Sequence, residues 1–350
     1  LQASRVSVDY STDGVAHTLA YASTETDRQN YALGMPTFGV SGKLERFEYL
    51  GSVSSLPGFD LVFGADLEQA DSDTSGRDNR GVFVEYLSDF SDSVFITAGV
   101  RHDDNDDFGT NLSYRLSGAY LVDLGAEATL KLRGAYGTGF RAPSLFEVEY
   151  NSGPFAFAPA ALISLEQEKS RGYELAVEYL VGNELKLEAV YFDQQIDDVI
   201  YFDLAGFSGY LQDLGVSISA GVELSARYLL ADNFEVAANY TYNETERPNG
   251  QQRIRRPKNL ANLALSYRTP GDRLALNAFY RIARNAVDEV SGSTTLLEDF
   301  EVLDLSLSYE LSGNVRLTGR IENATDEQYM EVIDYNTARR AYYVGVRLAF

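Results

Sequence analysis

Long runs in which apolar and polar residues strictly alternate constrain the fold of this chain more than any other feature. Between residues 303 and 311, the odd positions are four leucines and a tyrosine, and the even positions are Asp304, Ser306, Ser308 and Glu310. Similar runs cover 59–68, 185–191, 234–242, 274–280 and 315–322. Because successive side chains of a strand point to opposite faces, these runs predict strands with one apolar and one wet face.

Composition excludes several other classes of protein. The chain has no cysteine and only His17 and His102, so it offers no disulfide scaffold, zinc finger, iron–sulfur site or thiol nucleophile. Its formal charge of -23 argues against nucleic-acid binding, which needs a basic face. No apolar run approaches the ~18 residues of a membrane helix. An acidic soluble protein and a membrane β-barrel remain, and we expect no metal site and no cofactor.

The connections between the predicted strands favour the membrane barrel. Short ones lie near 11–14, 54–58, 89–92, 123–126, 181–183, 231–233, 270–271 and 312–313. Longer ones lie near 23–41, 70–79, 103–108, 139–168, 194–216, 244–256, 285–298 and 323–338. Short turns on one side and long loops on the other are typical of outer-membrane barrels. We therefore predict an all-β fold, a transmembrane antiparallel β-barrel.

The number of segments and the two ends of the chain suggest a piece of a longer protein. We count about seventeen strands, whereas bacterial single-chain barrels have even numbers. The chain starts in a strand-like alternation without a signal peptide. It ends with apolar residues at every second position, which looks like the signal read by the outer-membrane barrel assembly machinery. These residues are Tyr342, Val344, Val346, Leu348 and Phe350.

Several motifs follow one another in a family order. Residues 137–147 read GTGFRAPSLFE, which resembles the GxGFRAPSLxEL box of TonB-dependent outer-membrane receptors. The later segments 165–175, 191–200, 221–224, 255–257, 323–329 and 335–340 resemble further boxes of that family. One departure is the segment 159–162, which reads PAAL where the family usually has an Asn-Pro start. The last hundred residues look most like the cobalamin receptor and related siderophore receptors.

The resemblance implies a receptor of the bacterial outer membrane that actively takes up a scarce, large ligand such as cobalamin or a ferric siderophore. It implies twenty-two strands around an N-terminal plug, so that residues 1–350 are the C-terminal part of the barrel and the plug is absent. The implied partners are outer-membrane lipid and lipopolysaccharide, a small-molecule or metal-chelate ligand, and TonB, which would bind the missing N-terminal region.

Two groups of side chains are candidates for function. Exposed loop aromatics can stack on a flat or cyclic ligand, although packing within the loops is an equal alternative. These residues are Phe155, Phe157, Tyr201, Phe202, Phe207, Tyr210 and Tyr335. Charged residues of the wet faces would face the lumen and the plug, or simply pair across strands. They are Lys131, Arg133, Glu174, Glu178, Arg316, Arg320, Glu322 and Arg347.

Other functions compete with uptake. A passive porin-type channel is the main alternative, and it would lack the FRAP sequence at 140–143. A barrel enzyme would need an acid and a serine elbow near His102, and neither is evident. Haem uptake is disfavoured because residues 141–168 contain no histidine. The acidic run 103–107 lacks the spacing of a calcium loop and is read as a solvated charge run.

Overall fold

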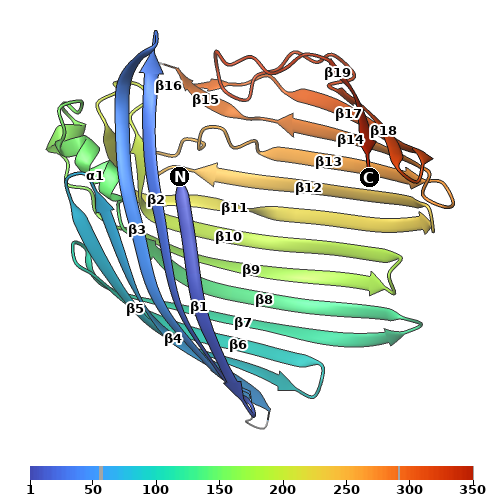
Figure 1. Cartoon of the computed structure of the whole chain (residues 1–350), viewed down its shortest axis with the longest axis horizontal. Coiled ribbons are helices and arrows are strands. Elements are labelled where there is room, and N and C mark those ends of the chain that lie inside the picture. The colour runs from blue at the N-terminus through green and yellow to red at the C-terminus, as the bar shows by residue number, and fades with distance from the viewer. Residues whose placement is uncertain (55–57, 291, 350) are drawn as a thin grey trace.

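Antiparallel strands make up most of the computed structural model, which describes residues 1–54, 58–290 and 292–349 (Figure 1). The first strands are β1 (Gln2–Thr12), β2 (Val15–Ala32), β3 (Met35–Val53), β4 (Phe59–Ser72), β5 (Gly76–Phe90), β6 (Val94–Asn105), β7 (Gly109–Gly125) and β8 (Ala128–Arg141). The α-helix α1 (Leu145–Ser152) and the 3-10 helix η1 (Ala160–Leu162) follow. The remaining strands are β9 (Glu168–Val181), β10 (Leu185–Phe202), β11 (Tyr210–Ala231), β12 (Phe234–Glu246), β13 (Asn259–Arg268), β14 (Leu274–Arg284), β15 (Val287–Val290), β16 (Ser293–Leu296), β17 (Phe300–Ser312), β18 (Val315–Glu322) and β19 (Ala341–Leu348).

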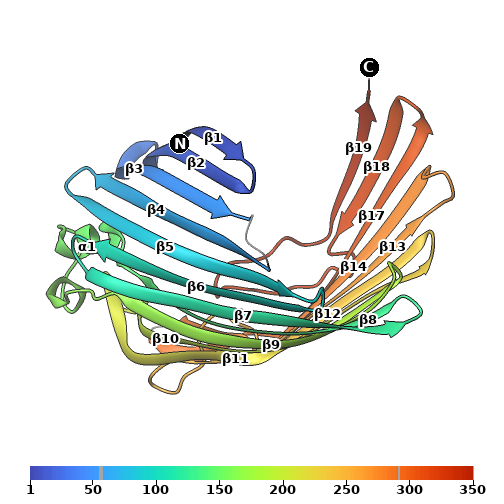
Figure 2. The same cartoon turned by 90° about the horizontal axis from the view of Figure 1, so that it is seen from below.

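Strands that are neighbours in sequence are neighbours in one large sheet. Each pairs with the next, and β14 pairs with β17 because β15 and β16 form a separate small hairpin. The large sheet has 17 strands within the described residues, which agrees with the number read from the sequence. It curves into a trough whose edges are β1 and β19 (Figure 2). The all-β antiparallel fold is confirmed, whereas closure into a twenty-two-stranded barrel stays a prediction.

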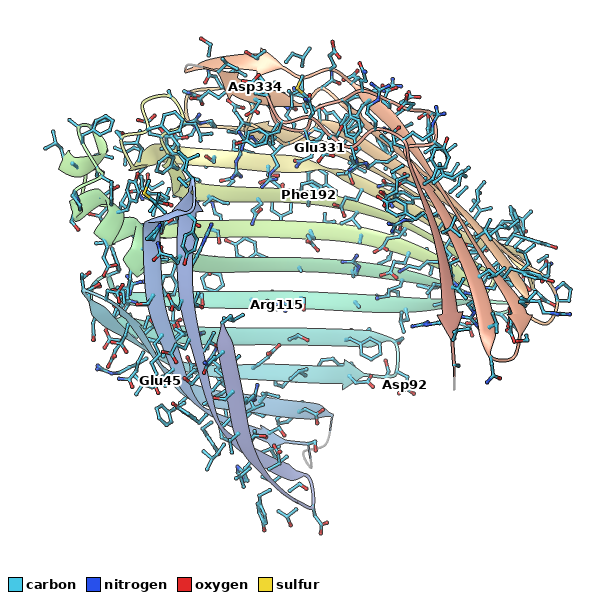
Figure 3. The ribbon with its side chains drawn as sticks, turned by 45° about the horizontal axis from the view of Figure 1, so that its top comes forward. Glu45, Asp92, Arg115, Phe192, Glu331 and Asp334 are labelled. Atoms are coloured by element: carbon cyan, nitrogen blue, oxygen red, sulfur yellow. The ribbon has the colours of Figure 1, made fainter. Side chains whose placement is uncertain are left out.

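The two faces of the trough differ in polarity as the alternation predicts. Figure 3 looks into the trough, where Arg115 and Phe192 lie on the concave face. Strand register places the charged rows on that face, and leucines alternate with them on the convex face. Leu116, Leu187 and Leu307 on the convex face are 55%, 41% and 44% exposed. An unburied apolar surface of this extent fits lipid contact, because soluble proteins rarely expose such patches.

Short and long connections lie at opposite ends of the sheet, as predicted, only from β8 onward. The predicted long loops 23–41, 70–79 and 103–108 are wrong, because they shrink to turns of two or three residues, and the predicted loop 194–216 is mostly strand. Strands β2 and β3 continue through most of 23–41 and meet in a tight turn at 33–34. Strands β10 and β11 likewise pair through most of 194–216. A strand of about 10 residues already crosses the hydrocarbon core, and continued pairing satisfies the backbone beyond it. The polar residues of these two segments indicated that the strands extend into water, and not that the strands end there.

Helices play a small part in this fold. In the described residues, no helix is both long and apolar enough to cross a membrane.

One motif glycine has a packing role in the sheet. A Cβ at Gly221 would lie 1.9 Å from the carbonyl oxygen of Tyr242 on the neighbouring strand β12. Gly221 pairs with Phe192 of β10, whose ring atom Cζ would lie 3.0 Å from that Cβ. The glycine of the 221–224 box therefore allows β11 to approach both neighbours closely.

Candidate functional site

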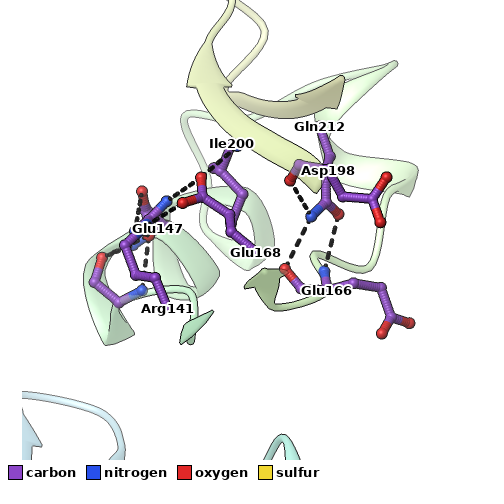
Figure 4. A network of polar contacts seen from close by, with 8 residues as sticks. Arg141, Glu147, Glu166, Glu168, Asp198, Ile200 and Gln212 are labelled. Carbon is purple, nitrogen blue, oxygen red and sulfur yellow. Dashed lines mark hydrogen bonds and ion pairs between the residues drawn. The ribbon is translucent and has the colours of Figure 1, made fainter. Parts of the chain in front are cut away.

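The long-loop end of the sheet is organised around the guanidinium of Arg141 (Figure 4). Arg141 ends β8 and forms a bidentate pair with Glu168 of β9, with N–O distances of 2.9 and 2.8 Å. Its Nη1 also donates to both carboxylate oxygens of Glu147, at 3.2 and 2.9 Å. Glu168 additionally accepts the backbone N–H of Ile200 at 2.7 Å. Arg141 therefore joins β8, β9, β10 and α1, which is a structural role.

Helix α1 starts where the FRAPS sequence ends, although sequence reasoning expected only a loop there. Ser144 is the N-cap, and its hydroxyl accepts the backbone N–H of Glu147 at 3.2 Å. Glu147 accepts the backbone N–H of Ser144 at 2.7 Å, which completes a capping box. The Ser-x-x-Glu pattern was therefore a readable sign of this helix.

The C-terminal half of α1 also fastens the neighbouring loop between β4 and β5. One oxygen of Glu149 accepts the hydroxyls of Thr74 at 2.6 Å and Ser75 at 2.5 Å, and that of Ser72. Burial alone would raise the pKa of Glu149, but these three hydrogen bonds outweigh it and lower the pKa. Sequence reasoning missed Glu149, because its partners lie more than seventy positions away in the chain.

Two of the predicted aromatics pack on α1. Phe202 and Tyr210 lie 5.6 and 5.7 Å from Tyr150 between ring centroids, in edge-to-face geometry. Phe207 joins this group through Phe202 at 6.3 Å. Tyr201 lies apart and carries the guanidinium of Arg247 over its ring at 4.8 Å. Sequence reasoning missed Tyr150, which brings these rings together.

Four predicted aromatics expose most of their surface. Phe155 and Phe157 follow α1 and are 65% and 53% exposed, and Phe207 on the adjoining hairpin is 63% exposed. The backbone N–H of Phe157 donates to the carbonyl of Ser208 at 3.1 Å, which holds the two segments together. Tyr335 is 72% exposed and lies on the separate loop 323–340. Phe157 and Phe207 lie beside the packed cluster, whereas Tyr335 lies on another loop, and the role of the exposed rings in binding stays a prediction.

Loop 323–340 enters the concave side of the trough (Figure 2). Asn323 is buried, and its side chain bonds to both backbone groups of Glu327 at 2.8 and 2.9 Å. Tyr329 stacks on Phe300 with 4.2 Å between centroids, beneath Arg281. The motif at residues 323–329 therefore has a structural role.

A buried carboxylate connects this loop to the β15–β16 hairpin. Asp288 is 1% exposed and accepts hydrogen bonds from Arg255 Nε at 3.0 Å and from the backbone N–H of Ile333 at 2.9 Å. Sequence reasoning missed Asp288, because nothing local distinguishes it from other loop acids.

The predicted charged residues lie on the concave face. Near β8–β10, Lys131 and Arg133 reach Glu178 at 3.0 and 3.1 Å, and Arg133 also reaches Glu174 at 3.6 Å. At the other edge Arg320 pairs with Glu322 at 3.1 Å and lies over the ring of Tyr343. The remaining two, Arg316 and Arg347, face each other across β18 and β19. Cross-strand pairing accounts for most of these contacts, and a role against a plug stays a prediction.

The residues of the predicted assembly signal share the convex face of β19. Tyr342, Val344, Val346 and Leu348 are 66%, 92%, 62% and 55% exposed. Phe350 lies outside the described residues.

Within the described ranges, no group of three or more His, Asp or Glu side chains could hold a metal ion. The acidic run 103–107 belongs to the β6–β7 hairpin, where Asp103 pairs with Arg101 at 2.7 Å.

Comparison with known proteins identifies relatives of this architecture. The family described as "TonB dependent receptor-like, beta-barrel" matches residues 2–324. A vitamin B12 transporter, BtuB, of Photobacterium profundum is 28% identical over 281 residues, which is 78% of this chain and 43% of that protein. An iron-regulated outer membrane virulence protein of Vibrio cholerae is 24% identical over 292 residues, 77% of this chain and 44% of that protein.

Solved structures show the same fold. The ferric enterobactin receptor PfeA of Pseudomonas aeruginosa superimposes with a TM-score of 0.77 at 19% identity, covering 99% of this chain and 61% of that one. The chain thus spans less than half the length of the curated relatives described above. The family match covers nearly all of the chain, so it belongs to the TonB dependent receptor-like β-barrel family, whose members are transport receptors of the outer membrane and not enzymes.

Proposed function

We propose that this chain is the C-terminal barrel portion of a receptor for energised uptake across the outer membrane. Its ligand would be scarce and too large for passive channels, such as cobalamin or a ferric siderophore. The observation that carries this proposal is the asymmetry of the trough: short turns at one end, and at the other a long segment, 142–167, fixed by Arg141 and bearing exposed rings.

The energy would come from outside this segment. A plug preceding Leu1, pulled by TonB, would open the path, and the described strands would provide the wall and the receptor loops. The convex face would contact lipid and lipopolysaccharide, and β19 would present the signal for the barrel assembly machinery. The names of the relatives, one for vitamin B12 and one for ferric enterobactin, support both ligand classes.

Uptake by cells tests this function directly. A strain without its own cobalamin and siderophore receptors would express the full-length gene. We expect accumulation of radiolabelled cyanocobalamin or of a ferric siderophore, and we expect a protonophore or loss of TonB to abolish it. Accumulation that continues without TonB would instead support the passive channel.

A further inference from the structure

An apolar groove of about 650 Å³ crosses the convex face of β1 to β5. Its apolar lining comes from alternate residues of each strand, which point to this face. Ala65 stands between Tyr49 and Val82 in one row of the sheet, and its small side chain leaves the floor of the groove low. The lining includes Val8, Leu19, Phe47, Tyr49, Ala65 and Val82.

A stack of three rings borders this groove on the side of the short turns. Antiparallel pairing makes β1, β3, β5, β7 and β9 end on the same side of the sheet, opposite the segment 142–167. Tyr10 of β1 pairs with His17 of β2 close to the turn at 13–14. Outer-membrane barrels have such short turns in the periplasm. The ring stack therefore lies at the level of the inner-leaflet headgroups, where aromatic rings gather.

His17 is held between Tyr10 and Tyr49. Its ring is nearly parallel to both, with distances between centroids of 6.4 and 6.0 Å. Its Nδ1 lies 2.9 Å from the hydroxyl of Tyr49. Gly51, which pairs with His17, leaves room for that hydroxyl, because a Cβ at Gly51 would lie 3.1 Å from it. The orientation of the imidazole is therefore fixed, and Tyr49 connects it to the groove.

The other imidazole nitrogen, Nε2, has no protein partner. No group of residues 1–54, 58–290 and 292–349 hydrogen-bonds to it, and it is not one of the sealed side-chain nitrogens of those ranges. When the Tyr49 hydroxyl donates to Nδ1, the neutral ring carries its hydrogen on Nε2. An N–H group on a lipid-facing surface is unfavourable without an acceptor. A lipid phosphate at this level supplies that acceptor.

The charges near the stack select the type of headgroup. Residues 6–27 and 47–76 contain no Lys or Arg. Asp13 lies in the exposed turn between Tyr10 and His17. A carboxylate and electron-rich rings attract an ammonium group, whereas a headgroup with a net negative charge would meet no cation in these segments. A zwitterionic headgroup fits this combination of an imidazole donor and a carboxylate.

The opposite end of the groove carries a cation, Arg80. It lies 3.7 Å from Asp78 and 3.8 Å from Asp106, so its charge is already compensated. His102, the second histidine of the chain, continues the row of the groove beside Val82. It lies three residues before the end of β6, on the side of the segment 142–167. The two ends of the groove therefore belong to different leaflets and can be tested separately.

We propose that the groove and the ring stack bind one zwitterionic phospholipid of the inner leaflet, with an ethanolamine headgroup. An acyl chain lies in the groove over Ala65. The phosphate accepts the Nε2–H of His17, and the ammonium group lies between Asp13 and the ring of Tyr10. The site is separate from the captured ligand, and lipid binding there does not depend on uptake.

Native mass spectrometry of the purified full-length receptor, titrated with lipid and released from detergent, tests the site. The two probes are dilauroyl phosphatidylethanolamine, which is zwitterionic, and dilauroyl phosphatidylglycerol, which is anionic. We expect the first to bind at least fivefold more tightly. His17→Ala removes the donor and Ala65→Phe fills the groove, so each should lose at least fivefold in affinity for phosphatidylethanolamine.

His102→Ala is the matched control, since it makes the same substitution at the other end of the same row. It should change the affinity for phosphatidylethanolamine less than twofold, and so should Arg80→Gln. Asp13→Asn should reduce the preference for phosphatidylethanolamine over phosphatidylglycerol, because it removes the partner of the ammonium group. An unchanged preference in Asp13→Asn would contradict the assigned headgroup.

Three other results would overturn the proposal. Equal affinity for the two lipids, or unchanged affinity in both His17→Ala and Ala65→Phe, would show unspecific annular lipid only. A larger loss in His102→Ala or Arg80→Gln than in His17→Ala would assign the groove to the outer leaflet. A lower thermal unfolding temperature of lipid-free His17→Ala would assign the ring stack to folding, whereas an unchanged temperature together with the loss of affinity supports the site.

Discussion

Replacing Arg141 should release the segment 142–167 without unfolding the sheet. Arg141→Gln removes the cation between Glu147 and Glu168, whose side chains are each 13% exposed. The two carboxylates would then repel each other without a partner, and the capping box of α1 would lose its support on β8.

The magnitude follows from the geometry and the exposure. A hydrogen-bonded charge pair that is shielded from solvent contributes about 1.5–3 kcal/mol. The Arg141 side chain is 43% exposed, so solvent screening reduces that contribution. We expect a loss of about 2 kcal/mol in the opening free energy of the segment, which is roughly a thirtyfold increase in the open population.

Hydrogen exchange of the full-length receptor, read by mass spectrometry on peptides from 142–167, measures this opening. Exchange in peptides from the middle of β9 and β10 should not change. Arg227→Gln is the matched control, because it breaks a pair of 2.7 Å with Glu235 on exposed strand ends and should leave 142–167 unchanged. Unchanged protection in Arg141→Gln, or a coupling to Glu168 below about 0.3 kcal/mol in a double-mutant cycle, would refute this reasoning.

Three more outcomes are expected. Gly221→Ala should lower the free energy of unfolding by about 1–3 kcal/mol, because its methyl group would clash with the carbonyl of Tyr242. The variant should therefore unfold at a lower temperature, and an unchanged unfolding temperature would contradict the close approach. The pKa of Glu149 is lowered, so its hydrogen bonds stabilise the β4–β5 loop at pH values above the usual pKa range of carboxyl groups. This stabilisation is lost as the pH falls below that range. Exchange of that loop, corrected for the intrinsic rate, should therefore rise in acid, but not in Glu149→Gln. Arg339 lowers the pKa of Asp326 to about 2, so loop 323–340 should stay ordered through pH 4 and loosen only as the pH approaches 2. Loosening near pH 4, or the same pH profile in Asp326→Asn, would be inconsistent with a stabilising Arg339–Asp326 pair.

The motifs in the sequence revealed more of the site than the aromatic side chains did. The FRAPS sequence marked the start of a long receptor loop, and its Ser-x-x-Glu continuation encodes the cap of α1 locally. The aromatics Phe202 and Tyr210 were recognisable as candidates, but their packing on Tyr150 was not. Their partner comes from another loop, so no local spacing shows whether a ring is packed or free to bind.

For charged residues, too, the sequence does not show which residue from another segment is the partner. Arg247, Arg253 and Arg255 stand close together in the chain and look equivalent. Asp213 and Asp288 neutralise the first and the third, and both acids lie more than thirty positions away. Only the assembled loops show that, among the described residues, no carboxylate pairs with the guanidinium of Arg253.

The sequence by itself determined the strands and their two faces, and it sorted short from long connections correctly only from β8 onward. Alternation is a local property, because each residue's face follows from its position in an extended backbone. The tertiary structure decided where strands outlast their apolar runs, which rings pack on α1 and which loop cations stay unpaired. Those outcomes depend on contacts between segments that are distant in the chain. The curved sheet brings these segments together, and so it decides which residue pairs with a charge or covers a ring.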